Sequence, residues 1–268
     1  MKTYIVDSFT QEPFKGNPAG VCFPRQALGL ATMLKVAQEF GLSETAFVWE
    51  TDTDGVYAIR YFSPKQEIPL CGHATLAAAK VLFTKTPQTD LYFLTHEQVD
   101  LSIRGRGEDI TMAFPVYDTV PATAPPLLLA ALGVPTVVHT AFSPKNKILL
   151  LELADAQVLA ALRPDFHALL HSYTGLNGVL VTAASQGAYD YHYRYFWPWA
   201  GTNEDPVTGG VQTFLAKYWA TRLHKQVMQA FQASSRTGSM QVELLPDAVL
   251  LTSQACIVLE GQLAAFAE

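Results

Sequence analysis

Two stretches in the first half of the chain return in the second half. Residues 60–64 (RYFSP) recur as residues 194–198 (RYFWP), with four of the five positions identical. Residues 67–72 (EIPLCG) recur as residues 204–209 (EDPVTG), which keep the Glu, the Pro and the Gly. The copies lie 134 residues apart (60 to 194) and 137 residues apart (67 to 204), close to half of the 268-residue chain. A repeat of this period predicts a duplicated domain.

The composition is that of a globular protein with a large core. Apolar residues make up 49% of the chain and charged residues 16%, which argues against disorder. The net charge of −6 argues against a nucleic-acid-binding surface, because phosphate binding needs a basic patch. The three cysteines are too few, and odd in number, for a disulfide framework.

The sequence also lacks the patterns of a signal peptide and of a membrane span. Residues 1–9 alternate like a strand and do not form the apolar core of a signal peptide. The strongest uncharged apolar run, residues 127–134, is too short to cross a bilayer. We therefore expect a soluble, cytoplasmic protein that binds neither nucleic acid nor a membrane.

Strand-like patterns dominate both halves of the sequence. Residues 189–195 place a Tyr at every odd position, which is the period of a strand. Residues 26–40 predict a helix that Gly41 ends. Each copy of the repeat leads into an apolar segment, residues 73–83 or 210–220, and a helix that is apolar nearly all round is a buried one. The sequence therefore predicts an α+β fold with two pseudo-equivalent domains, each a β-barrel-like sheet wrapped around a central helix.

The best candidate for a domain boundary lies near the middle of the chain. Residues 115–126 are rich in Pro, Ala and Thr, as linkers often are. We expect an N-terminal domain over residues 1–117 and a C-terminal domain over residues 118–255.

Both predicted central helices begin with small residues, Cys71–Ala74 in the first half and Thr208–Val211 in the second. The exposed N–H groups at a helix start attract a carboxylate or a phosphate. A glycine there lets a ligand approach the backbone closely. If a pseudo-twofold axis relates the halves, the two helix starts face a shared cleft. On either helix alone the glycines can simply fit a tight turn, and that alternative stays open.

Several motifs resemble those of the phenazine-biosynthesis PhzF-like family. Residues 6–10 (VDSFT) and 14–21 (FKGNPAGV) are similar to its N-terminal signature. Residues 42–47 (LSETAF), 70–75 (LCGHAT) and 204–209 (EDPVTG) are similar to later signatures, in the same order and spacing.

The resemblance implies a diaminopimelate-epimerase-like fold, with two similar barrels, an active site between them, and commonly a homodimer. It also implies that a C-terminal segment, about residues 256–268, completes the first domain. The best-known member isomerises a small carboxylate without a metal or an organic cofactor, so we expect a small-molecule carboxylate substrate and no cofactor.

The family's acid/base glutamate falls on Glu44, which follows Gly41 and precedes an apolar strand. At such an element boundary a carboxyl group can face a cleft and transfer a proton. His73 and Asp205 are similar to the family's substrate-contacting pair. Asn17 lies in a Gly-Asn-Pro turn, where it can position the site or simply support the turn. The expected catalytic residues are therefore Glu44, His73 and Asp205. The expected substrate-binding residues are Asn17, Cys71, Gly72, Thr208, Gly209 and Gly210.

Two positions depart from what related enzymes have. A serine that binds the substrate carboxylate often follows the second Thr-Gly of the family, but here that residue is Gly210, so only backbone N–H groups remain. Racemases of this fold use a thiol at each helix start, whereas this chain pairs Cys71 with Thr208. A threonine hydroxyl is far too weak a base to replace a thiolate. The copies therefore share a scaffold and differ in chemistry, which favours proton transfer on one side of a substrate.

The sequence predicts a cofactor-independent isomerase and leaves two alternatives open. An amino-acid epimerase or racemase needs a second base that the sequence does not show clearly. A non-catalytic metabolite-binding protein would keep the same cleft. We expect no metal site, because His167 and His171 stand at helical spacing but lack a third ligand nearby in the sequence.

Overall fold

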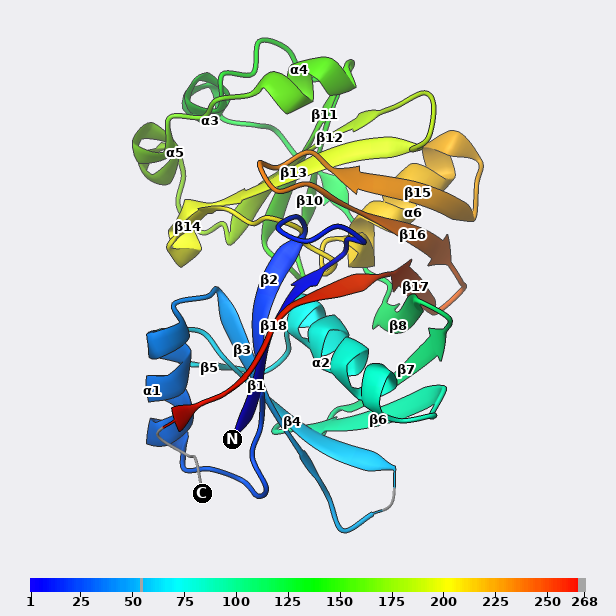
Figure 1. The fold of residues 1–268 in the computed structure, drawn as a ribbon. Coiled ribbons are helices and arrows are strands. Elements are labelled where there is room, and N and C mark those ends of the chain that lie inside the picture. The colour runs from blue at the N-terminus through cyan, green and yellow to red at the C-terminus, as the bar shows by residue number, and fades with distance from the viewer. Residues whose placement is uncertain (54, 265–268) are drawn as a thin grey trace. The chain divides into compact units, whose positions relative to one another are not determined.

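The computed structural model describes residues 1–53 and 55–264. Residue contacts divide the chain into two compact units, which we call unit 1 and unit 2 (Figure 1). Unit 1 consists of residues 1–113 and the C-terminal residues from Leu251 onward, and unit 2 consists of Phe114–Leu250. The segment that the resemblance implies for completing the first domain, residues 256–268, contributes a strand to unit 1, and its residues 265–268 lie outside the described residues.

Unit 1 contains mostly strands and one long buried helix. Its strands are β1 (Lys2–Ser8), β2 (Asn17–Phe23), β3 (Glu44–Glu50), β4 (Val56–Phe62), β5 (Glu67–Ile68), β6 (Asp90–Thr95), β7 (Asp100–Arg106), most of β8 (Asp109–Pro115) and β18 (Ala255–Gln262). Its helices are α1 (Leu30–Phe40) and α2 (Gly72–Lys85).

Unit 2 has a similar secondary-structure content, with additional short helices. Its strands are β9 (Val120–Pro121), β10 (His139–Ser143), β11 (Ile148–Leu153), β12 (Gly178–Ala184), β13 (Tyr191–Trp197), β14 (Thr202–Glu204), β15 (Val227–Gln232), β16 (Gly238–Leu244) and β17 (Ala248–Ser253), which runs on into unit 1. Its helices are α3 (Pro126–Leu132), α4 (Ala156–Ala161), α5 (Phe166–Ser172), the 3₁₀ helix η1 (Pro198–Ala200) and α6 (Gln212–Leu223).

Each unit follows the same series of strand pairings. In unit 1, β1 pairs antiparallel with β2, β2 parallel with β3, β3 antiparallel with β4, β4 parallel with β6, and β6 antiparallel with β7. In unit 2 the strands β10, β11, β12, β13, β15 and β16 repeat that series with the same directions. The predicted α+β fold with two equivalent sheet-and-helix units is confirmed.

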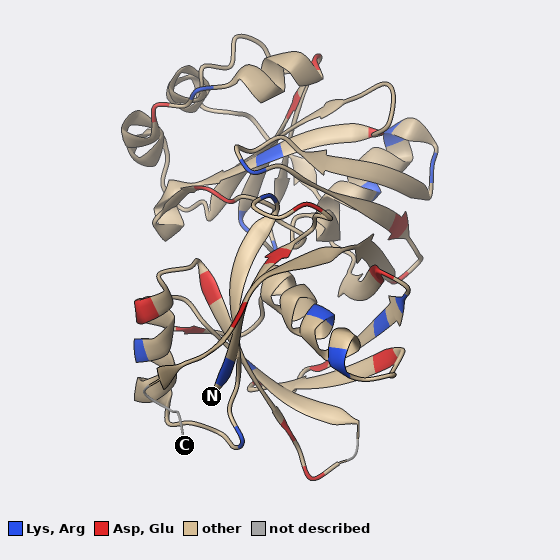
Figure 2. Ribbon diagram, viewed as in Figure 1, with Lys and Arg blue, Asp and Glu red and all other residues tan. Residues whose placement is uncertain are grey.

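Helix α2 is buried because almost every one of its side chains is small or apolar. It packs against β1, β2, β3 and β18, and the side chains from His73 to Leu82 are buried apart from Lys80. Its two lysines, Lys80 and Lys85, lie in its second half (Figure 2). The prediction of a buried central helix over residues 73–83 is confirmed, with one residue more at its start and two at its end.

Helix α6 is buried in the same way but begins later than its sequence predicts. Its side chains from Gln212 to Ala216 are buried, and it packs against β16. The prediction placed its start at Gly210. Residues 209–211 instead form a tighter turn, in which the amides of Gln212 and Thr213 donate to the carbonyls of Gly209 (3.0 Å) and Gly210 (3.3 Å). The two helix starts are therefore not identical in shape.

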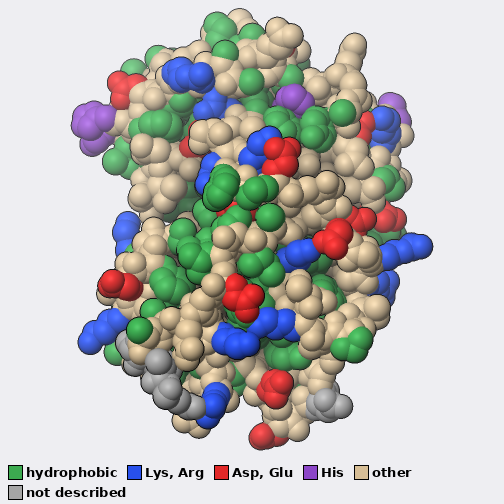
Figure 3. Space-filling view, viewed as in Figure 1, with side chains coloured by type: hydrophobic (Ala, Val, Ile, Leu, Met, Phe, Trp, Pro, Cys, Tyr) green, Lys and Arg blue, Asp and Glu red, His purple; other side chains and the backbone are tan. Residues whose placement is uncertain are grey.

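On the face shown in Figure 3, Lys and Arg side chains alternate with Asp and Glu, and the described residues form no broad basic area there. Among the described residues, no helix is both long enough and apolar enough to cross a bilayer.

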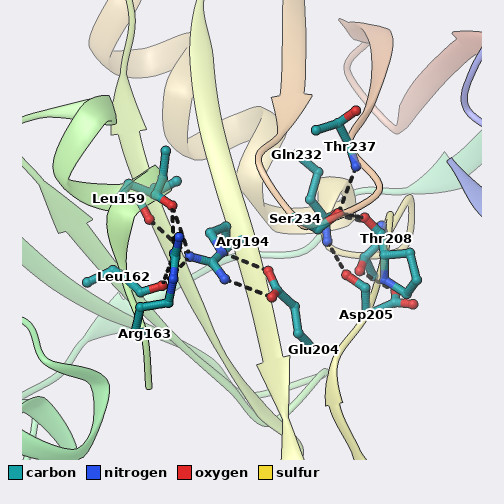
Figure 4. Close-up of polar contacts among 12 residues, drawn as sticks. Leu159, Leu162, Arg163, Arg194, Glu204, Asp205, Thr208, Gln232, Ser234 and Thr237 are labelled. Atoms are coloured by element: carbon teal, nitrogen blue, oxygen red, sulfur yellow. Dashed lines mark hydrogen bonds and ion pairs between the residues drawn. The ribbon is translucent and has the colours of Figure 1, made fainter. Parts of the chain in front are cut away.

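The repeated Arg and Glu of the sequence form the same ion pair in both units. Arg60 donates from Nε and from a terminal nitrogen to Glu67, at 2.6 and 2.7 Å. Arg194 makes the same two-bond contact with Glu204, at 2.7 and 2.8 Å (Figure 4). Arg194 also donates to the carbonyl of Leu162 at 2.8 Å. Each pair joins a long strand to the short strand that precedes the central helix, and this shared structural task explains why the repeat keeps these residues.

Candidate functional site

In unit 1, three predicted site residues lie at the ends of neighbouring elements. Asn17 begins β2, Glu44 begins β3, and His73 is the second residue of α2. Strands β2 and β3 run parallel, with Ala19 opposite Glu44, so both strands begin at the same edge. All three side chains are buried, with at most 8% of each residue exposed. The fold therefore brings together residues that lie up to 56 positions apart in the sequence.

The imidazole of His73 lies between the Glu44 carboxylate and the Asn17 amide. His73 Nε2 is 3.2 Å from Glu44 Oε2, and His73 Nδ1 is 3.4 Å from Asn17 Nδ2. Burial lowers the pKa of His73, and the nearby Glu44 charge opposes that shift only in part. A neutral imidazole fits both neighbours if Nε2–H donates to Glu44 and Nδ1 accepts from Asn17. This assignment of the ring proton follows from the hydrogen-bond partners.

Cys71 completes this cluster from the N-cap position of α2. Its Sγ lies 3.4 Å from His73 Nδ1 and 3.9 Å from His73 Nε2. The Cys71 side chain does not cap the helix, and its own carbonyl accepts from the amide and the hydroxyl of Thr75. Glu44, Cys71 and His73 each offer one ligand atom, and these three atoms lie within 4.8 Å of one another. Among the described residues of unit 1, this group could hold a metal ion.

One supporting residue of this cluster was not predicted. Ser8, the last residue of β1, is fully buried and donates from Oγ to the carbonyl of His73 at 2.7 Å. It pairs with Asn17 across β1 and β2. The available signal was a serine at the end of a strand-like run. Ser8 ties the first turn of α2 to the strand pair that carries Asn17.

In unit 2, the predicted residues Asp205 and Thr208 form a closed turn between β14 and α6. The Thr208 hydroxyl donates to Asp205 Oδ2, and the Asp205 amide donates to the carbonyl of Tyr195 at 3.1 Å. The Tyr193 hydroxyl donates to the carbonyl of Thr208 at 3.2 Å. Asp205 is 7% exposed. The turn therefore holds a buried carboxylate against a hydroxyl, directly before the glycines that lead into α6.

Gln232 holds this turn at both ends, and it too was not predicted. Its Nε2 donates to the carbonyl of Asp205 at 2.6 Å, and its Oε1 accepts from the amide of Thr208 at 2.7 Å (Figure 4). Ser234 adds a bond from its hydroxyl to the carbonyl of Pro206 at 2.6 Å. The sequence did contain an indication of this role. Gln232 occupies one of the alternating buried positions of β15, after Met228 and Ala230, where an apolar residue is usual. A glutamine in that phase indicates backbone groups that need partners.

The strand registers identify which residues of unit 2 correspond to the cluster of unit 1. Thr45 pairs with Phe62 in unit 1, and Val179 pairs with Phe196 in unit 2. Phe62 and Phe196 occupy the same position of the repeat, so their partners Thr45 and Val179 correspond to each other. The residue before Val179 therefore corresponds to Glu44. That residue is Gly178, so unit 2 has no carboxylate there.

The ring of Tyr195 occupies the space that a side chain at position 178 would need. A Cβ on Gly178 would lie 2.5 Å from the ring of Tyr195, which is itself 5% exposed. The same repeat places Gly210 at the position of His73. At the position of Cys71, unit 2 has the hydroxyl of Thr208.

The predicted glycines take different places in the two units. Gly72 is the first residue of α2, whereas Gly209 and Gly210 belong to the turn before α6. A Cβ on Gly210 would meet nothing within 4 Å, so this position has room for the serine that the resemblance leads one to expect. The departure at Gly210 is therefore not forced by packing.

Two other features lie apart from these residues. A pocket of about 550 Å³ in unit 1 is lined by the second half of α2 and by β18, with Lys80 and Cys256 among its residues, and none of the predicted site residues lines it. His167 and His171 lie exposed on α5, where His171 Nδ1 contacts the carbonyl of His167 at 2.7 Å.

Comparison with known proteins places the chain in a family. A family model described as phenazine biosynthesis-like protein matches residues 6–261. The chain belongs to this family. A rat phenazine biosynthesis-like domain-containing protein is 37% identical over 98% of both chains. A Pseudomonas aeruginosa protein named as an uncharacterized isomerase is 40% identical over 97% of both chains.

Solved structures of the family confirm the fold. A PhzF-family protein from Enterococcus faecalis is 35% identical, covers 97% of each chain, and matches with a TM-score of 0.89. A probable proline racemase from Agrobacterium radiobacter, at 11% identity and a TM-score of 0.60, shares the fold alone. The resemblance to the PhzF-like family and its epimerase-like fold is therefore confirmed.

Proposed function

We propose that this family member is a cofactor-independent isomerase that moves a proton within a small carboxylate metabolite. The observation that carries the proposal is the buried contact between Glu44 and a neutral His73 at the start of α2. The names of two relatives, from P. aeruginosa and Halalkalibacterium halodurans, describe uncharacterized isomerases and support the same class of reaction.

Glu44 is the proposed proton carrier. Its carboxylate takes a proton from a substrate carbon that an adjacent carbonyl or unsaturated group makes acidic. The C–H bond breaks, its electron pair moves into the conjugated group, and the protonated Glu44 returns the proton to another carbon of the same molecule. His73 Nε2–H holds the carboxylate in position, and Asn17 fixes the imidazole from the other side.

The remaining predicted residues are proposed to bind the substrate. The N–H groups of the first turn of α2, from Gly72 onward, suit a substrate carboxylate because they have no partner within the helix. Asp205 is proposed to accept a hydrogen bond from a substrate amino or hydroxyl group. The turn of Thr208, Gly209 and Gly210 is proposed to contribute backbone N–H groups.

The difference between the units favours transfer over inversion. Inverting a carbon requires one base on each face, and the positions in unit 2 that correspond to Glu44 and His73 are both glycines. Thr208 corresponds to Cys71, and its hydroxyl already donates to Asp205. We therefore favour a proton shuttle with one carboxylate over an amino-acid epimerase or racemase.

Deuterium exchange tests this function. Small unsaturated carboxylic acids are incubated with the protein in heavy water, and incorporation at carbon is followed by NMR and mass spectrometry. For any acid that exchanges, we expect Glu44→Gln to slow the exchange by about 10²–10⁴-fold, because the amide cannot carry the proton. Glu39→Gln, an exposed Glu-to-Gln change on α1, is the matched control and should exchange at the normal rate.

The outcomes separate the three hypotheses. Exchange that survives in folded Glu44→Gln protein would remove Glu44 from the mechanism. Exchange at a stereocentre with inversion of configuration would favour an epimerase. An acid that binds equally well to both proteins and never exchanges would indicate a metabolite-binding protein.

A further inference from the structure

The cluster at the start of α2 contains three different metal-binding groups: a carboxylate, a thiol and an imidazole. They belong to Glu44, Cys71 and His73, each with at most 8% of its surface exposed. Cys71 is the N-cap residue of α2, His73 is the second residue of that helix, and Glu44 begins β3. The ligand atoms are within 4.8 Å of one another in unit 1 alone.

Their spacing is close to that of a zinc site. Zinc binds nitrogen and oxygen at about 2.0 Å and thiolate sulfur at about 2.3 Å in a tetrahedron, so ligand atoms lie about 3.3 Å (N to O) and about 3.5 Å (S to N) apart. In the cluster, His73 Nε2 is 3.2 Å from Glu44 Oε2 and 3.9 Å from Cys71 Sγ. All three ligand atoms lie within 4.8 Å of one another, so metal binding requires the Cys71 side chain to move closer to its two partners.

The charges also suit a divalent cation. A thiolate and a carboxylate together balance the two charges of zinc, so the loaded cluster is neutral overall, as a buried site requires. The mixture of thiolate and imidazole ligands selects zinc over magnesium or calcium, which prefer oxygen.

We propose that Glu44, Cys71 and His73 form a zinc-binding site with three protein ligands and one open position. Binding releases the thiol proton of Cys71 to solvent as the S–Zn bond forms. The proton of His73 moves from Nε2 to Nδ1, which lies 3.4 Å from Asn17 Nδ2. Once the Asn17 amide turns over, Nδ1–H donates a hydrogen bond to its oxygen. The open fourth position takes a water molecule or a carboxylate.

Zinc at this site inhibits the protein. The metal occupies the carboxylate of Glu44 and the Nε2 of His73, so neither is available for proton transfer. This consequence rests on the proposed function, whereas the binding itself does not.

Metal titration of tag-free, chelator-treated protein tests the site without any substrate. Cobalt(II) serves as the coloured probe, and zinc is then added to displace it and to measure stoichiometry and affinity. We expect one metal per chain, the absorption of tetrahedral cobalt, and a thiolate-to-cobalt charge-transfer band. Zinc binding should release one proton per chain from the thiol into a weakly buffered solution.

Variants identify the ligands. Cys71→Ser should abolish the charge-transfer band and weaken zinc binding by more than about 100-fold, since the loss of a supporting group alone typically costs 10–100-fold. The fold tolerates this change, because Cys71 sits at an N-cap position where serine is favoured. Cys256→Ser is the matched control and should bind zinc like the unchanged protein, since Cys256 lies on β18.

The competing site is the exposed pair on α5, His167 and His171. Zinc binding that persists in Cys71→Ser but is lost in His171→Gln would overturn the proposal, as would the absence of stoichiometric binding. Binding with the expected spectrum, in a protein that shows no deuterium exchange, would uphold the zinc site and count against the proposed isomerase. Exchange that zinc leaves unchanged at full occupancy would refute the inhibition.

Discussion

At the scale of single residues, Gly16 fixes the backbone beside the Glu44 cluster. Its φ of +66° is in the left-handed region, and a Cβ there would lie 2.1 Å from the carbonyl oxygen of Ser8. Ser8 in turn holds the carbonyl of His73, and Asn17 follows Gly16 directly. The close approach of the two backbones at Gly16 therefore sets the position of two residues that touch His73.

We predict that Gly16→Ala is strongly destabilising. Overpacking against a backbone atom typically costs about 1–3 kcal/mol, and the left-handed conformation adds roughly 1–2 kcal/mol for a residue with a Cβ. Gly41→Ala is the matched control, since its φ is +63° but a Cβ there meets nothing within 4 Å. Urea unfolding of both variants should show the larger loss of unfolding free energy for Gly16→Ala. Equal losses would mean that the loop relaxes away from Ser8.

The sequence predicted which residues approach His73 far better than it predicted what supports them. The resemblance named Asn17, Glu44 and Cys71 through their motifs, and the fold brings all three close to His73. Ser8 and Gln232 were not predicted, because a serine at a strand end and a glutamine in a strand are common for many reasons. Their roles depend on which backbone groups the fold leaves unpaired, and that is decided by tertiary contacts.

At the scale of elements, the turn between β14 and α6 depends on a side chain from β15. Gln232 satisfies one backbone acceptor and one backbone donor of that turn, from Asp205 and Thr208. Buried groups of this kind are costly to leave unpaired, at about 1–3 kcal/mol each. The turn therefore takes its rigidity from a strand that follows it in the chain.

We predict that Gln232→Met loosens this turn. Methionine is similar in size but offers neither bond, so the variant should lose about 1–3 kcal/mol of unfolding free energy, and the amide of Thr208 should exchange with solvent much faster. Gln229→Met, on the same strand with a partly exposed side chain, is the control and should leave the Thr208 amide protected. Unchanged protection in Gln232→Met would show that Tyr193 and Ser234 hold the turn by themselves.

Helix boundaries illustrate what sequence patterns can resolve. The end of α1 was predicted correctly, because Gly41 takes the left-handed conformation and its amide donates to the carbonyl of Ala37 at 3.1 Å. Its start was predicted four residues too early, because Gly29 adopts an extended conformation and α1 begins at Leu30. The start of α6 was predicted two residues too early, because the residues before Gln212 take a tighter turn that the apolar pattern does not distinguish from a helix.

At the scale of the whole molecule, duplication was the most secure inference from the sequence. A repeat period of half the chain predicted two equivalent units, and the matching series of strand pairings confirms them. The connection that returns the last strand to unit 1 was not visible in the residues. It came only from the resemblance, because a pattern of apolar residues does not say which edge a strand will join.

We predict that the unfolding free energy falls as the pH drops below about 6.5, in part because of His192. Burial beside Tyr189 and Phe231 lowers the pKa of His192. At pH values between the lowered pKa of His192 in the folded protein and its unfolded value of 6.5, the unfolded chain binds more protons than the folded protein does. The stabilisation is therefore complete above pH 6.5 and is lost as the pH falls towards the folded pKa.

Equilibrium unfolding in urea between pH 4.5 and 8 measures this effect, with the range chosen to span roughly two units below the histidine reference value. His192→Gln should show a weaker dependence on pH in this interval than the unchanged protein. The surface variant His167→Gln should keep the full dependence. If His192→Gln and the unchanged protein give parallel curves, His192 is not a source of the acid sensitivity.

The packing of Tyr195 over Gly178 restricts the mutational routes by which this protein can change its chemistry. A carboxylate at position 178 would give unit 2 a counterpart of Glu44, but the ring of Tyr195 already fills the space that such a side chain would need. Shrinking Tyr195 alone leaves a cavity, and enlarging Gly178 alone overfills the site, so each single substitution lowers stability. A descendant with a base in each unit therefore requires both substitutions at once, or a stability reserve gained elsewhere beforehand.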